Sequence, residues 1–145
     1  MATIQDLDTC HLFARSETLP IAIGWLGKGS DFGKGPVEEG LFRRLCELCA
    51  APWQPAVSAG VHRCELCQFD PPVFSGCVFV PNLGRIFVAP VGIVHYVSTH
   101  WYRPPEVFVD AVLVCPPMRS MEYKKALLAG GGRTLVRPAT DGAGV

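Results

Sequence analysis

Two short clusters of cysteine and histidine constrain this chain more than any other feature of its sequence. The first is a C-x-x-C at Cys64 and Cys67, with His62 just upstream, and the second is an H-x4-H at His95 and His100. Two cysteines and two histidines are the ligand set of a tetrahedral zinc site. A C-x-x-C turn lets two thiolates converge on one ion, and two histidines spaced in this way can reach that ion from the ends of one helical stretch. The spacing predicts Zn²⁺ bound by Cys64, Cys67, His95 and His100, with His62 as the substitute for one of the later histidines.

The number of protein ligands decides what such a zinc ion can do. Four protein ligands make a closed, structural site, whereas three leave a position at which a water can be activated for hydrolysis. In that second case His62 or Glu65 would serve as the base. A redox-active C-x-x-C is a further alternative, but its usual context is the start of a helix in a βαβ unit. Simple packing of the four side chains is the remaining alternative.

The other cysteines are less informative. A second C-x-x-C, at Cys46 and Cys49, lies in an amphipathic helical pattern, so we interpret both as core thiols; a four-cysteine site with Cys64 and Cys67 is the alternative. Three more cysteines stand beside apolar residues and are expected to be buried: Cys10, Cys77 and Cys115. Because seven is an odd number, a disulfide framework would leave one thiol unpaired.

The apolar patterns predict an α+β fold. We expect a small single domain with a β-hairpin and three to four helices around the Cys/His zinc site, spanning residues 1–132, followed by a mobile tail over residues 133–145. A strand is expected near 19–26, and the hairpin is expected to pair 76–80 with 85–89 across a turn at 81–84. The expected helices cover residues 36–49, 91–102, 106–115 and 118–129.

Charge and hydropathy narrow the classes of partner. Thirteen basic residues balance thirteen acidic ones, which argues against a nucleic-acid partner because phosphate binding relies on clustered Lys and Arg. The sequence has no apolar run of membrane-spanning length and no signal-peptide pattern at its start, so we expect a cytoplasmic chain without membrane contact. No Ser/His/Asp order or pair of carboxylates indicates an enzyme.

These features favour a non-enzymatic role. We expect a structural zinc ion in a protein-interaction or regulatory module, of an immunity or adaptor kind, whose partner is another protein. A zinc-dependent hydrolase and a nucleic-acid-binding zinc module are the alternatives. Two aromatic residues, Trp101 and Tyr102, follow His100; we expect them to pack over the metal with Arg103 in solvent, and a recognition surface is the other interpretation.

Several segments resemble a family of uncharacterised bacterial proteins, over about residues 20–130. The resemblance implies that a His-x-Cys-x-x-Cys knuckle and a His-Tyr-x3-His-x-Tyr-x-Pro-Pro segment are the family's signature, and it implies no activity. The segments that carry it are Ala22–Leu26, Gly60–Cys67, Ala89-Pro90, His95-Tyr96, His100, Tyr102–Pro105 and Ala111-Val112.

Overall fold

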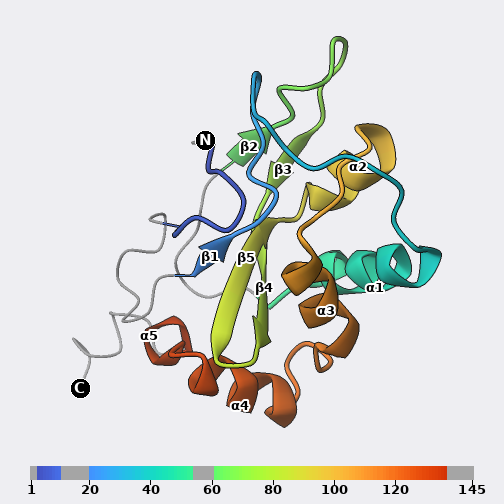
Figure 1. The fold of residues 1–145 in the computed structure, drawn as a ribbon. Helices are drawn as coiled ribbons and strands as arrows, with labels where there is room; N and C mark the ends of the chain where they lie inside the picture. Colours follow the sequence, from blue (N-terminus) through green and yellow to red (C-terminus); the bar gives the residue numbers. More distant parts are fainter. Residues whose placement is uncertain (1–2, 11–19, 54–60, 137–145) are drawn as a thin grey trace.

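A three-stranded sheet forms the centre of the computed structural model, which describes residues 3–10, 20–53 and 61–136 (Figure 1). Its strands are β1 (Ile21–Ala22), β5 (Arg85–Pro90) and β4 (Cys77–Asn82), in the order β1-β5-β4. β1 runs parallel to β5, and β4 runs antiparallel to it. Both long strands are almost wholly buried, as expected for apolar sequences rich in β-branched residues at the centre of a fold.

The predicted hairpin is confirmed, with a tighter turn than expected. The two strands pair from Cys77↔Pro90 to Asn82↔Arg85, which leaves only Leu83 and Gly84 as the connection. Both residues have positive φ, of 49° and 77°, as a two-residue turn of the primed type requires. Pro81 lies within β4, where a missing N–H is tolerated because β4 is an edge strand of this sheet.

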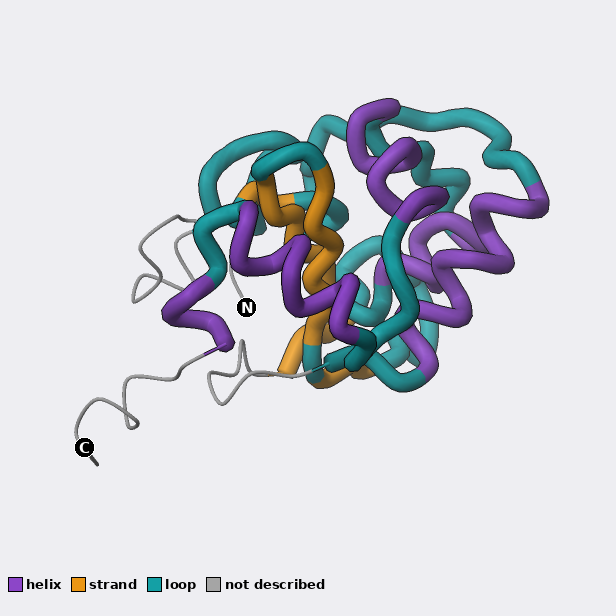
Figure 2. Tube along the Cα trace, turned by 90° about the horizontal axis from the view of Figure 1, so that it is seen from below, coloured by secondary structure: helices purple, strands orange, loops and turns teal. Residues whose placement is uncertain are grey.

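Helices cover the sheet, and Figure 2 shows them gathered mainly on one side of the strands. The helices are α1 (Glu39–Ala50), α2 (Ile93–Thr99), α3 (Glu106–Val114), α4 (Met121–Ala129) and the four-residue α5 (Arg133–Val136). Three of them, α1, α3 and α4, contact β4. The fold is therefore the predicted small α+β domain.

Local backbone conformation explains where the elements differ from the predicted ranges. The strand expected near 19–26 pairs only at Ile21–Ala22, because Gly24 turns the chain with a φ of 76°; Leu19 lies outside the described residues. The helix expected over 91–102 ends at Thr99, because Trp101 adopts a left-handed φ of 57°. α4 begins late because Ser120 caps it by accepting a hydrogen bond from the Tyr123 N–H.

The glycine run at 130–132 does not end the folded chain. α5 follows it directly, and Leu135 within α5 is buried. The folded part therefore continues at least to Val136, beyond the predicted boundary at residue 132. The rest of the predicted tail, residues 137–145, lies outside the described part of the chain.

A second sheet, which the sequence patterns do not predict, lies beside α2. It pairs β2 (Val61–Arg63) with β3 (Val73–Ser75) in antiparallel register, and His62 stands opposite Phe74. The connection between these strands carries Cys64 and Cys67. No helix among the described residues is both long and apolar enough to cross a bilayer.

Candidate metal centre

The two cysteines of the centre come from the loop that leaves β2. The Cys64 N–H donates a hydrogen bond to the carbonyl of Pro72, 3.0 Å away, which closes the loop at its base. Cys64 is buried and Cys67 is half-buried. The loop therefore presents one sulfur from inside the fold and one nearer the surface.

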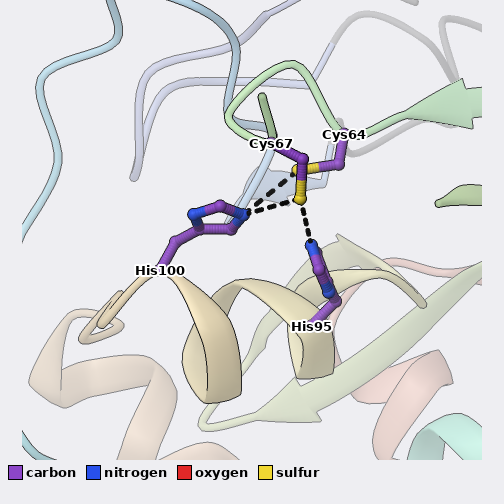
Figure 3. A group of neighbouring side chains, drawn as sticks. All are labelled: Cys64, Cys67, His95 and His100. Carbon is purple, nitrogen blue, oxygen red and sulfur yellow. Dashed lines mark hydrogen bonds between the residues drawn. The ribbon is translucent and has the colours of Figure 1, made fainter. Parts of the chain in front are cut away.

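The two histidines come from the two ends of α2. His95 lies in its first turn, and His100 is the C-cap residue, whose N–H donates to the Tyr96 carbonyl at 2.9 Å. Both side chains point toward the loop of the cysteines, as Figure 3 shows. The seven-residue helix and its C-cap residue thus supply the two imidazoles, as the H-x4-H spacing predicts.

Four ligand atoms converge at this place. The Cys64 Sγ lies 3.4 Å from the His100 Nε2, and the Cys67 Sγ lies 3.3 Å from the Nε2 atoms of both His95 and His100. One ligand atom from each residue lies within 4.8 Å of all the others. In a tetrahedral zinc site, bond lengths of about 2.3 Å to sulfur and about 2.0 Å to nitrogen place those atoms about 3.5 Å apart. The observed spacings therefore fit a small tetrahedral ion.

The contacts of Cys67 fit a metal better than a hydrogen-bond network. A thiol carries one proton, so the Cys67 Sγ can donate to only one of its two imidazole neighbours, and from the other it can only accept a weak hydrogen bond. A single ion between the four atoms would satisfy both sulfurs and both nitrogens at once. The donor set is therefore chemically suited to a borderline-soft cation such as Zn²⁺.

The environment favours the neutral forms of His95, His100 and Cys67 in the absence of a metal. Burial lowers the pKa of His95 and of His100, and for His95 the neighbouring His100 contributes. Burial raises the pKa of the Cys67 thiol, with a smaller contribution from Cys64. Neutral imidazoles are ready to bind a metal, whereas the thiol must lose a proton, so metal binding at this site would release protons.

Contacts with Thr99 and Phe74 orient the His95 ring. The His95 Nδ1 faces the Thr99 hydroxyl at 3.4 Å, which leaves Nε2 for the centre. The Phe74 ring lies 5.7 Å from the His95 ring, between centroids. β3 and α2 therefore hold this imidazole between them.

His62, the substitute ligand considered above, does not join the group. Its ring is buried, and its Nε2 lies 2.6 Å from the hydroxyl of Tyr96. Burial lowers the pKa of His62. His62 therefore ties β2 to α2 behind the centre, a contact between residues far apart in the sequence that spacing alone does not reveal.

Glu65, the other candidate base, is directed toward a different loop. Its carboxylate accepts a hydrogen bond from the Lys28 N–H at 3.0 Å. Cys46 and Cys49 lie on α1 and are not part of the cluster of ligand atoms. The remaining cysteines are buried as predicted: Cys10, Cys77 and Cys115.

Trp101, Tyr102 and Arg103 only partly follow the prediction that the two aromatic residues pack over the metal and that Arg103 lies in solvent. Trp101 is 62% exposed, so the prediction that it packs over the centre is wrong; its positive φ turns the side chain outward. Tyr102 is fully buried, and its hydroxyl donates to the Asp6 carboxylate at 2.7 Å. Arg103 is exposed as expected. The sequence gives no sign of the Asp6–Tyr102 pair, whose members lie far apart along the chain.

The fold and site define a small α+β domain with a cluster of two cysteines and two histidines that could hold a metal ion. The chain belongs to a family described as a domain of unknown function, DUF7919, whose model matches residues 2–113. The match includes all four residues of the cluster and leaves α4 and α5 outside. No curated protein and no solved structure matches the chain significantly.

Proposed function

We propose that this chain binds one Zn²⁺ through Cys64, Cys67, His95 and His100, and that the ion has a structural role in a protein-interaction or regulatory module. One observation carries the metal assignment: two sulfur and two nitrogen atoms from distant segments lie within 4.8 Å of one another, with three sulfur–nitrogen distances of 3.3–3.4 Å. An immunity or adaptor role, in which the domain acts by binding another protein, is the form of activity we expect.

Zinc fits this donor set better than other common ions. Two thiolates and two imidazoles in tetrahedral arrangement are the ligands of structural zinc, whereas Mg²⁺ and Ca²⁺ prefer oxygen ligands. Thiolate ligands also require a reducing environment to remain available. We therefore propose a cytoplasmic location for the protein.

The arrangement supports a structural ion over a hydrolytic one. Four protein ligands complete a tetrahedron, so no position is left for an activated water. The two bases that a hydrolase would use are engaged elsewhere: His62 with the Tyr96 hydroxyl and Glu65 with the Lys28 N–H. The balanced net charge also disfavours a nucleic-acid ligand.

The family resemblance supports one further proposal. We propose that the knuckle and the His-Tyr-x3-His segment are shared by bacterial members of the family. An alignment of member sequences in which His95 or Cys67 is freely replaced by residues unable to bind a metal would contradict it.

Metal analysis tests the assignment. Protein purified without added metal is expected to contain one zinc ion per chain, as measured by inductively coupled plasma mass spectrometry. Substitution with Co²⁺ is expected to give the absorption spectrum of a tetrahedral site with thiolate ligands. Cys67→Ser should lose the metal. Cys46→Ser is the matched control, because Cys46 lies on α1 outside the cluster, and it should keep a full complement.

Two results would contradict the proposal. Protein that binds neither zinc nor cobalt would remove the metal altogether. A cobalt spectrum that changes when a small anion such as azide is added would reveal an exchangeable position, which would favour the hydrolase instead.

A further inference from the structure

The helix α3 is apolar on faces that the rest of the described chain leaves uncovered. Seven of its nine residues are apolar, and the polar exceptions are Glu106 and Asp110. Its inner face is buried, but Leu113 is 51% and Val114 is 64% exposed. The outer face therefore combines exposed apolar side chains with Glu106 and Asp110, and large apolar side chains exposed in this way are suited to a contact with another molecule.

One side of this helix forms a groove with the segment that leads into α1. The groove has a volume of about 340 Å³, which lies within the range of binding clefts. α1 and α3 lie side by side in Figure 1 and contact each other. Apolar residues from both sides line the groove: Pro36, Val37, Leu41, Val109 and Leu113.

The rim of the groove is acidic although the whole chain is neutral. Glu38, Glu106 and Asp110 line it, with Arg103 as its single cation. Arg103 is 3.8 Å from Glu106, a long and exposed ion pair. Among the described residues, Glu38 and Asp110 form no salt bridge within 4 Å, so two carboxylates of the rim have no cationic partner.

We propose that this groove binds a cationic amphipathic segment of a partner protein, with apolar side chains in the groove and Lys or Arg residues against the rim. This inference rests on the protein-interaction role proposed above, but it does not depend on the metal. Amphipathic segments commonly bind with their apolar side chains in a groove between helices. Complementary charges on the two partners set the specificity and the association rate.

A second copy of this chain fits the groove less well. A two-fold symmetric dimer brings the same patch of each chain against the other. Here that arrangement would place Glu38 and Asp110 of one copy near those of its partner. Like charges brought together at an interface are strongly unfavourable.

A displayed library of random 16-residue peptides, selected against the full chain as purified, tests the proposal. We expect the enriched peptides to carry apolar residues flanked by Lys or Arg. Measured by fluorescence anisotropy, their affinity should fall at least tenfold in Leu113→Glu and in Asp110→Lys. Leu128→Glu and Glu122→Lys are matched controls on exposed positions of α4, and they should bind as the wild type does.

A charge exchange makes the test sharper. A selected peptide whose Lys residues are changed to Glu should lose binding to the wild type and regain part of it with Asp110→Lys. Folding of each variant is checked by its melting temperature, and zinc content is measured on the same samples, so failure of the metal assignment shows separately.

Four results would overturn the inference. The first is enrichment of acidic or neutral peptides, and the second is the absence of any binder. The third is the recovery of binders that Leu113→Glu leaves unaffected, which would place the interaction elsewhere and leave the module role standing. The fourth is a wild-type dimer in sedimentation that Leu113→Glu dissociates, since a second copy would then occupy the groove.

Discussion

Removal of the metal is expected to destabilise this protein without unfolding all of it. A zinc ion would join the loop after β2 to α2 and so close a loop of roughly 28 residues between Cys67 and His95. In the chain-entropy treatment of a cross-link, a loop of this length is worth about 3.5 kcal/mol. At about 3–4 °C per kcal/mol for a domain of this size, chelation should lower the melting temperature by about 10–15 °C.

The core gives the reason why the apo-protein should stay folded. Phe79, Phe87 and Phe108 are fully buried between the three-stranded sheet and its helices. Their rings form edge contacts with Trp53 and with one another. A classical zinc finger unfolds without metal because it has no comparable core. In this protein, removal of the metal should unfold only β2, β3 and α2.

Differential scanning calorimetry with and without chelator measures the fall in melting temperature. Hydrogen exchange followed by mass spectrometry locates the segments that lose structure. Exchange should rise in residues 61–75 and 93–100 and stay low in β4 and β5. Cys46→Ser should show the same chelator response as the wild type. An unchanged melting temperature would refute the reasoning that the ion cross-links the two segments, and exchange that rises equally in β4 would refute the independence of the core.

Three further substitutions test other parts of the fold. Burial raises the pKa of the Asp6 carboxyl above its ordinary value of 3.8, although the hydrogen bonds from Gly24 and Tyr102 act in the opposite direction. The stabilisation linked to this raised pKa is therefore fully present below pH 3.8 and is lost as the pH rises through the pKa of Asp6 in the folded protein. Tyr102→Phe removes one of these bonds and should cost about 1.5–3 kcal/mol at neutral pH and less at pH 4, by urea unfolding; an equal cost at both would contradict the charged bond. Gly92→Ala would overlap the Phe74 ring and should cost about 1–3 kcal/mol in thermal melts and weaken zinc binding in competition titrations. Gly40→Ala, in α1 with open space around it, should instead stabilise the chain by about 0.5–1 kcal/mol, and a loss in the same melts would contradict the helix assignment.

Local signals predicted the parts of this molecule that depend on neighbouring residues. The hairpin is encoded within one continuous segment, Cys77–Pro90, and the structure has it, although the turn is the two residues Leu83 and Gly84 and not the four that were expected. The two ligand pairs each lie within one short segment, and ligand chemistry indicates that the pairs meet. Helix positions follow from apolar periodicity, while their ends depend on single residues such as Ser120 and Trp101.

Contacts between distant segments could not be predicted from the sequence, for a physical reason. β2 and β3 are three residues each, too short for an alternating pattern, and they form because the closed loop between them brings them together. Tyr96 shows the consequence for the site. Its position in α2 is that of an ordinary core aromatic, yet its hydroxyl lies 2.6 Å from the His62 Nε2, and His62 stays outside the group that could hold a metal. This contact between β2 and α2, which accompanies the choice of four candidate ligands from five, is visible only in the three-dimensional fold.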